Sequence, residues 1–262
     1  MLVRLRQKLE LVYEVYNRRS FVNPDPLLFL YDYTKVRDRE VAGLVAACLA
    51  YGRVEMIMQA AAKVLTFLGP APGDRVTAIN DEEIRRGLAG FTYRFATLGH
   101  ITALILGMQR VIREYGSLEA CFMAGTDPED TTVLPGLQFL VQHLDPDGAC
   151  GHLLADPCKS SACKRSHLFL RWMVRNDLVD PGGWDQIRPD QLLIPLDRHM
   201  YAAGQMLGFT RRKSPDRAAC MEITEGFRKI APHDPVKYDF CLTRFGIQRT
   251  MDMTDLRTIL AG

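Results

Sequence analysis

The chain has 262 residues, of which 47% are hydrophobic and 24% charged, an ordinary composition for a globular protein with a buried core. Its formal net charge of +2 is too small to indicate a polyanion-binding protein unless the charge is locally clustered. The seven cysteines are odd in number and scattered, which argues against a disulfide framework and favours a reducing cytoplasm.

No segment has the pattern of a membrane span or a signal peptide. The N-terminal sequence MLVRLRQKLELVYEVY mixes charged and apolar residues at helical spacing and lacks the apolar block of a signal peptide. The longest internal run without Asp, Glu, Lys or Arg, residues 95–109, is too short to cross a bilayer. We therefore expect no membrane segment.

Apolar residues recur at three- and four-residue spacing along almost the whole chain, and alternating strand patterns are absent. This periodicity predicts an all-α fold. The predicted helices lie near residues 3–18, 38–51, 54–68, 81–89, 95–115, 132–144, 161–176, 198–207, 215–230 and 235–245.

The predicted helices are joined by turns, and no long flexible linker separates them. We therefore expect one helical domain over residues 1–262, composed of two lobes. One lobe spans residues 36–195, and the other combines residues 1–35 with 196–262.

The stretch from Lys159 to Asp197 carries the clearest functional pattern. Five basic residues and no acidic one lie between Lys159 and Arg175. Ser160 or Ser161 is a candidate N-cap for the following helix, which would place Lys164 in its first turn. The helix dipole and the neighbouring cations then favour the neutral amine that nucleophilic attack requires. A solvated surface lysine is the simpler interpretation of the same pattern.

Further along this helix, Lys164, Arg171 and Arg175 are spaced to share one face, and Phe169, Trp172 and Met173 lie on another. The basic face suits phosphate groups, whereas the aromatic face suits a core.

Asp197 follows Pro195 and precedes an amphipathic helix. Aspartate at this position is a good N-cap, which stabilises a helix by about 1 kcal/mol. A capping carboxylate is also held rigidly, so capping and catalysis are compatible roles.

The segments CKRSHLFLRWMV and LLIPLDRHMYAAGQMLGF resemble the core of the helix-hairpin-helix DNA glycosylase superfamily, which includes endonuclease III and the 8-oxoguanine glycosylases. Lys164 falls on the lysine position of that superfamily and Asp197 on its aspartate position. Closer still is the similarity to a bacterial family of uncharacterised proteins, through SACKR, FLRWMVR, IPLD and DPVKYDF.

The resemblance implies a two-lobed helical fold and a DNA glycosylase that extrudes a damaged base from the duplex, with an oxidised base as the suggested lesion. Lys164 would attack C1′ and form a Schiff base, giving AP-lyase activity, and Asp197 would assist. DNA phosphates would be contacted by basic side chains from two segments, namely Arg165, Arg171, Arg175, Arg211, Arg212 and Lys213. The candidate base-pocket residues are Tyr51, Trp172 and His199, although Trp172 also fits a core position.

Two departures distinguish the chain from the superfamily. Ser160 to Cys163 replace the glycines whose N–H groups hold a DNA phosphate, and Asp197 lies 33 positions after Lys164 (197 − 164), a wider spacing than in endonuclease III. Archaeal 8-oxoguanine glycosylases resemble the chain in having an unorthodox hairpin and a wider spacing. In that comparison the register shifts by one residue, so Arg165 is an alternative occupant of the lysine position, but arginine cannot be deprotonated for attack.

Cys150, His152, Cys158, Cys163 and His167 lack the paired spacing of a structural zinc site, so we expect neither metal nor cofactor. Two alternatives to a glycosylase remain open. The first is a non-catalytic nucleic-acid-binding protein on the same scaffold, and the second is a helical protein-interaction scaffold. The sequence does not indicate the oligomeric state.

Overall fold

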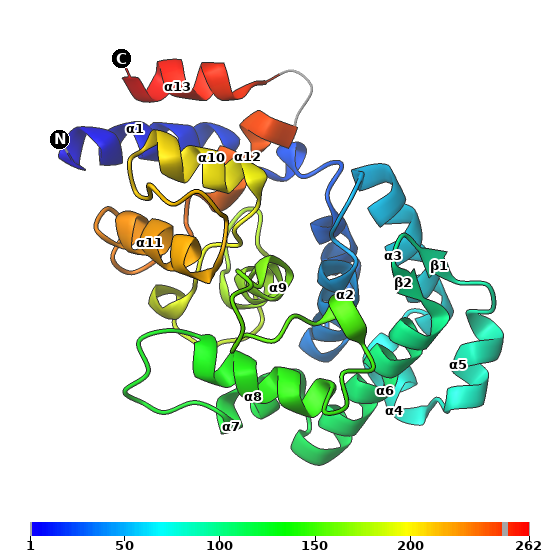
Figure 1. Ribbon diagram of the computed structural model, residues 1–262. Coiled ribbons are helices and arrows are strands. Elements are labelled where there is room, and N and C mark those ends of the chain that lie inside the picture. The colour runs from blue at the N-terminus through cyan, green and yellow to red at the C-terminus, as the bar shows by residue number, and fades with distance from the viewer. Residues whose placement is uncertain (1, 248–250, 262) are drawn as a thin grey trace.

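A computed structural model describes residues 2–247 and 251–261. These residues are predominantly helical, which confirms the all-α prediction (Figure 1). The α-helices are α1 (Leu2–Tyr16), α2 (Val36–Cys48), α3 (Val54–Leu68), α4 (Pro72–Ala78), α5 (Asp81–Gly87), α6 (Leu98–Tyr115), α7 (Leu118–Ala124), α8 (Leu134–Leu144), α9 (Lys164–Val174), α10 (Arg198–Met206), α11 (Arg217–Arg228), α12 (Asp239–Ile247) and α13 (Met253–Ala261). Short 3-10 helices are η1 (Arg19–Phe21), η2 (Pro26–Asp32), η3 (Gly151–Leu153) and η4 (Pro189–Gln191).

One small antiparallel sheet interrupts the helical chain. Strands β1 (Thr92–Tyr93) and β2 (Ala96–Thr97) pair with Tyr93 opposite Ala96, so Arg94 and Phe95 form the turn. Arg94 adopts a left-handed φ of 52° there. The sequence did not indicate this hairpin, because two-residue strands are too short to produce an alternating pattern.

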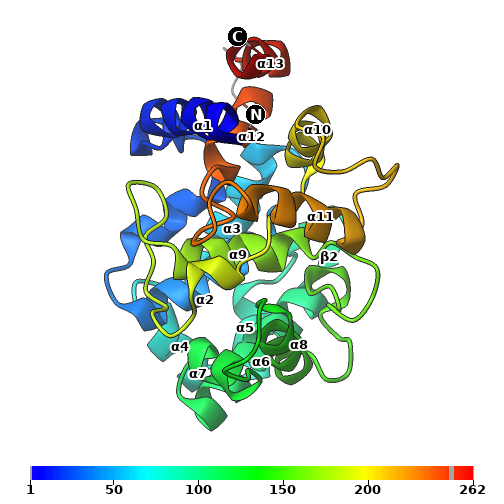
Figure 2. The same ribbon diagram turned by 90° about the vertical axis from the view of Figure 1, so that its left-hand side faces the viewer.

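The helices fall into two groups. Helices α1, α10, α12 and α13 lie together at one end in both ribbon views, with α11 beneath α10 (Figure 1, Figure 2). Helices α2 to α8 form the other group, and α9 runs between them against α2. The 3-10 helix η2 packs on α2 and α3, so part of the segment before residue 36 contacts the larger group.

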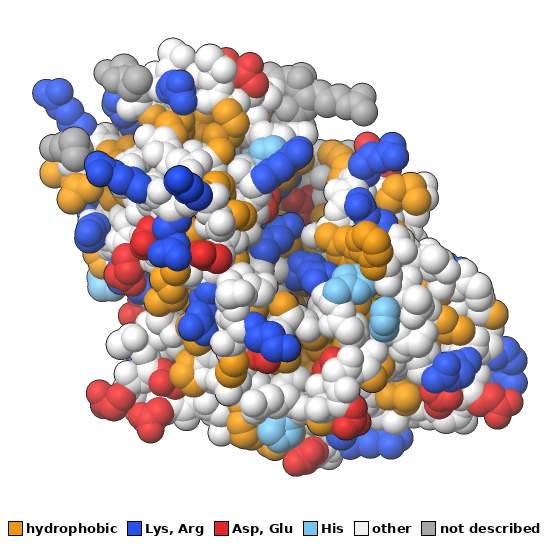
Figure 3. Space-filling view, viewed as in Figure 1, with side chains coloured by type: hydrophobic (Ala, Val, Ile, Leu, Met, Phe, Trp, Pro, Cys, Tyr) orange, Lys and Arg blue, Asp and Glu red, His pale blue; other side chains and the backbone are white. Residues whose placement is uncertain are grey.

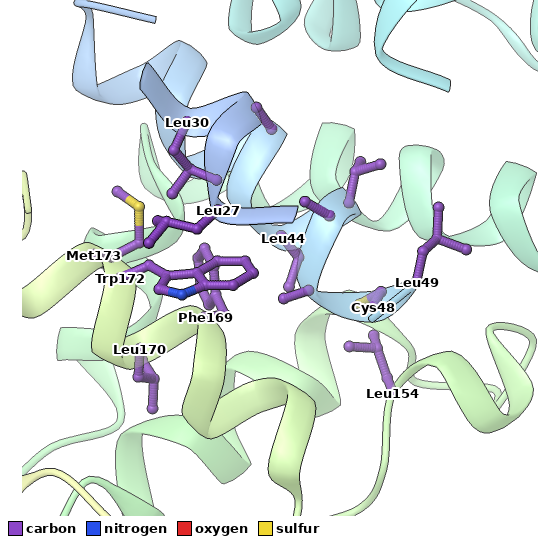
Figure 4. Close-up of a cluster of buried hydrophobic side chains, with 14 of the residues drawn as sticks. Leu27, Leu30, Leu44, Cys48, Leu49, Leu154, Phe169, Leu170, Trp172 and Met173 are labelled. Atoms are coloured by element: carbon purple, nitrogen blue, oxygen red, sulfur yellow. The ribbon is translucent and has the colours of Figure 1, made fainter. Parts of the chain in front are cut away.

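The core between α2 and α9 fixes the orientation of α9. Trp172 and Phe169 are buried there beside Leu27, Leu30 and Leu44 (Figure 4). Trp172 is 0% exposed and therefore does not line a base pocket. This corrects its assignment as a pocket residue, because its large apolar surface is more stable in the core than in a solvated cavity.

A network of buried ion pairs holds the C-terminal half of α9. Arg171 donates to Asp180 and Asp239, and Arg175 donates to Asp177, Asp180 and Asp234. Burial disfavours both guanidinium charges, but the carboxylates, Asp180 first, hold their pKa values above the ordinary value. The two arginines are 3% and 4% exposed.

The prediction that Arg171 and Arg175 contact DNA phosphates is therefore wrong. Their donors are already bound to carboxylates inside the protein, and removing one partner from a buried ion pair costs about 3–5 kcal/mol. Asp177 and Asp180 lie in the loop directly after α9, whereas Asp234 and Asp239 lie in a distant segment whose approach sequence spacing alone does not reveal.

Candidate active site

A central cavity of about 740 Å³ opens between the two groups of helices. Its wall includes Lys164, Asp197, His199 and Tyr51. Figure 3 shows this face hollowed near its centre, with Lys and Arg side chains gathered at the hollow. The fold thus brings Lys164 and Asp197 to one cavity, although 33 positions separate them (197 − 164).

Lys164 is the first residue of α9, two to three residues later than the predicted helix start. Ser161 does not cap the helix, because its Oγ accepts the N–H of Cys163 at 3.2 Å within the preceding turn. Cys163 takes a left-handed conformation, with φ 44°, that costs a non-glycine residue about 1–2 kcal/mol. Lys164 is half-buried, and its Nζ donates to the carbonyl of Ala50 at 3.2 Å.

The N-terminus of α9 borders a second cavity, of about 350 Å³, which shares Ala50, Tyr51 and Lys164 with the first. The N-cap residue Cys163 makes no side-chain capping hydrogen bond, so within the part of the chain that the structure describes the first N–H groups of this helix are available to an anion. Cys163 has a left-handed backbone conformation, which the glycine of a typical hairpin would adopt more easily.

Arg165 lines the second cavity and is not among the residues that line the central cavity. Its guanidinium donates to the carbonyl oxygens of Cys48 (2.9 Å) and His152 and lies over the ring of Tyr51. Of these two residues, Lys164 alone lines the central cavity, and Arg165 binds the backbone near Tyr51. These contacts occupy the side chain that we expected to contact phosphate.

Asp197 is the N-cap of α10, where its Oδ1 accepts the N–H groups of His199 (2.9 Å) and Met200 (2.8 Å). This confirms the capping prediction. Oδ2 has no hydrogen-bond partner among the residues that the structure describes. One oxygen is thus fixed by the helix, and the other remains available to the cavity.

His199 lies between the start of α10 and the end of α12. A Cβ added to Gly246 would come within 1.8 Å of His199 Nδ1, so only glycine permits this approach. Burial lowers the pKa of His199, Asp197 opposes the shift, and Arg198 and Lys164 reinforce it. A neutral imidazole therefore lines the wall at neutral pH.

The deep part of the cavity, which we call the floor, contains Arg171, which the sequence predicted as a phosphate contact, and two side chains that the sequence did not indicate, Asp239 and Arg244. Asp239, Arg171 and Arg244 all line the cavity and are each 2–3% exposed. Arg244 Nη2 donates to Asp25 at 2.9 Å, whereas its Nε has no hydrogen-bond partner in the described part of the chain. The DPVKYDF segment contained Asp239, but no spacing connects it to Lys164.

Three exposed arginines, Arg53, Arg94 and Arg198, also line the cavity and form its basic rim. None of them has a carboxylate within ion-pair distance in residues 2–247 and 251–261. Arg53 precedes α3, Arg94 lies in the turn between β1 and β2, and Arg198 is the first residue of α10. Because each is an isolated basic residue in the sequence, no charge cluster revealed them.

Arg211, Arg212 and Lys213 are exposed in the loop before α11, outside the residues that line the central cavity. Arg212 pairs with Asp216 at 3.2 Å. The structure therefore does not join this cluster to Lys164 and Asp197, although its surface remains accessible to a ligand.

No group of three or more His, Cys, Asp or Glu side chains able to hold a metal ion occurs within the described ranges. Cys150, Cys163 and His167 are buried, whereas Cys158 is exposed. Nor does any described helix combine the length and the apolar character that crossing a bilayer requires.

Comparison with known proteins gives a family but no activity. No curated protein and no solved structure matches the chain. The model of one family, described as a protein of unknown function (DUF2400), matches residues 25–248, which include α2 to α12 and every lining residue of the central cavity except Pro24. The chain therefore belongs to the DUF2400 family.

Proposed function

We propose that the chain is a DNA glycosylase with AP-lyase activity that excises a damaged base. The observation that carries this proposal is the presence of Lys164 and Asp197 on the wall of one cavity, although they are distant in sequence. An amine and a rigid carboxylate that face one cavity are the groups that attack on a sugar carbon requires. The cavity volume of about 740 Å³ lies within the usual range for small-ligand sites.

The mechanism assigns a separate task to each part of the cavity. The neutral amine of Lys164 attacks C1′ of the extruded nucleotide and displaces the base. The unpartnered Oδ2 of Asp197 stabilises positive charge on the sugar and accepts a proton from the attacking amine. The resulting Schiff base permits strand cleavage by elimination.

Two surface features support a nucleic acid as the substrate. The basic rim of Arg53, Arg94 and Arg198 offers charges that are not neutralised inside the protein. Phe95, 71% exposed at the tip of the β1–β2 hairpin beside Arg94, offers a face on which a base can stack. An oxidised base is the lesion class that the superfamily resemblance favours.

The proposal is tested by incubating the protein with duplexes that carry oxidised, deaminated or abasic sites in the presence of borohydride. We expect a covalent protein–DNA adduct with the wild-type chain. Lys164→Gln should abolish the adduct and retain DNA binding, because Gln cannot form a Schiff base. Lys159→Gln is the matched control, since it removes the same charge from an exposed neighbour.

Three results would count against the proposal. Absence of an adduct and of base release across all duplexes rejects the glycosylase activity, and an adduct that persists in Lys164→Gln rejects the assigned nucleophile. Salt-dependent binding without chemistry would instead indicate the non-catalytic nucleic-acid-binding alternative. One observation favours that alternative, because the Nζ of Lys164 is already engaged by the carbonyl of Ala50.

A further inference from the structure

Asp239 is a carboxyl group on the cavity floor whose bonding within the protein is incomplete. It begins α12, is 2% exposed, and lines the same cavity as Lys164 and Asp197. Its Oδ2 accepts a hydrogen bond from Arg171 Nη1, but its Oδ1 is buried with no partner among the described residues. A buried oxygen left unpaired costs about 1–3 kcal/mol, so this arrangement requires a proton or a ligand to explain it.

The groups facing Asp239 come from several elements. Arg171 belongs to α9, Asp180 to the loop after it, Asp197 to the start of α10 and the thiol of Cys220 to α11. Burial raises the pKa of Asp239 to about 6; Arg171 opposes this shift, and Asp197 and Asp180 add to it. Arg171 divides its charge between two carboxylates, and for this reason a single cation does not keep Asp239 fully ionised.

The two cavity carboxyls thus have opposite environments. Asp197 accepts two backbone N–H groups at a helix N-terminus, which stabilises negative charge. Asp239 is enclosed and has a second negative charge nearby. A pair of carboxyls in different environments is a common means of providing one base and one acid at a single site.

We propose that Asp239 is the acid that protonates the leaving base. The inference rests on the proposed function. As the C1′–N bond breaks, its electron pair passes to the nitrogen of the base, and this base takes the carboxyl proton of Asp239. The Nζ of Lys164 forms the new bond to C1′ and transfers its excess proton to Asp197. The carboxylate left on Asp239 is then stabilised by Arg171.

The test compares base release by wild-type protein and Asp239→Asn between about pH 5 and pH 8. Asn retains an acceptor for Arg171 but carries no acidic proton. We expect base release to fall about 100-fold in the variant below pH 6, the lower end of the usual contribution of acid–base catalysis. The ratio of the two rates should then shrink about tenfold for each pH unit above 6, because wild-type Asp239 also loses its proton. Taking a ratio cancels any pH dependence that the two proteins share.

Schiff base formation on an abasic duplex provides a second measurement, because no base remains to be protonated. In wild-type protein, the rate of base release relative to that of Schiff base formation should fall as pH rises above about 6. This measurement requires no variant to fold. Asp180→Asn is the matched control for the network, since it removes a buried partner of Arg171 that does not line the cavity. Because Asp180 helps to raise the pKa of Asp239, this variant should still release base at low pH and should lose that activity at a lower pH than wild type does.

The outcomes separate the inference from the function on which it rests. If the wild-type chain releases no base and forms no adduct on any duplex, the acid role of Asp239 and the glycosylase function are both rejected. If it does both, but the ratio for Asp239→Asn is constant with pH, the acid role of Asp239 is rejected and the glycosylase function stands. Equal loss of base release and of Schiff base formation in Asp239→Asn also rejects the acid role.

Discussion

Asp197 has a structural and a proposed catalytic role that one substitution can separate. Asn is as good an N-cap as Asp, so Asp197→Asn should keep the hydrogen bonds to His199 and Met200 while removing the charge. We expect base release and adduct formation to fall about 100-fold or more, the usual scale for a stabilising group of this kind. Thermal unfolding should change little, and both quantities can be measured on the same preparation.

Asp216→Asn provides the matched control, because Asp216 caps α11 outside the cavity by accepting the N–H of Ala219. It should leave the proposed activity intact. A large drop in unfolding temperature for Asp197→Asn, with activity lost in proportion, would assign Asp197 a capping role alone.

At the level of residues, the sequence predicted the identity of Lys164 and Asp197 better than that of their surroundings. Both residues occupy short motifs, and their placement in one cavity follows from the order of the helices. Burial of Arg171 depends on Asp180, in the loop after α9, and on Asp239, the first residue of α12. A charge stripe on a helix has the same spacing whether the partner is solvent, phosphate or a buried carboxylate.

At the level of elements, the long amphipathic helices were predictable, whereas of the three seven-residue helices α4, α5 and α7 the sequence predicted α5 alone. The helix predicted over residues 54–68 has these bounds in α3, whereas α4, α7 and α13 were missed. Helices of seven residues such as α4 and α7 contain too few turns to establish an apolar period. The predicted start at residue 235 was also wrong, because Asp234 binds Arg175 rather than capping α12.

Glu40 joins three elements and should make stability depend on pH. This α2 side chain is 1% exposed and accepts N–H groups from Leu118 (3.0 Å) at the start of α7 and from the indole of Trp184 (3.1 Å). Burial raises its pKa from 4.5 to about 7, although these donors oppose the shift. The folded protein therefore binds this proton more tightly than the unfolded chain. The resulting stability is fully present below pH 4.5 and is lost as pH rises through about 7.

The expected loss is about 3 kcal/mol in the free energy of unfolding, at 1.36 kcal/mol for each pKa unit. It is measured by denaturant unfolding of wild-type protein and of Glu40→Gln across this pH range, and the difference between the two removes the contributions of other groups. Glu82→Gln on the exposed surface of α5 is the control and should follow the wild-type curve. Parallel curves for wild type and Glu40→Gln would show that Glu40 does not titrate in this window.

At the level of the whole molecule, the cavity forms because C-terminal helices pack against the N-terminal part of the chain. Helices α10 and α12 pack together, α1 and α13 lie side by side, and Lys8 donates to the carbonyl of Leu260 at 2.8 Å. Segments around residues 25, 50, 164, 197 and 244 consequently meet in one cavity. A formal net charge of +2 gives no sign of the basic rim, because its arginines become neighbours only through this closure.

Substitutions in the basic rim test which surface of the protein binds DNA. We expect the triple variant Arg53→Ala, Arg94→Ala and Arg198→Ala to bind duplex DNA more weakly. Its plot of log affinity against log salt should be less steep by about 2.7, since each lost phosphate contact removes about 0.9 from the slope. Titrations at several salt concentrations measure both quantities.

Arg211→Ala, Arg212→Ala and Lys213→Ala together remove the same charge outside the cavity and should leave the slope nearly unchanged. If this control flattens the slope and the rim variant does not, DNA binds the loop before α11 instead, and Lys164 lies away from its path.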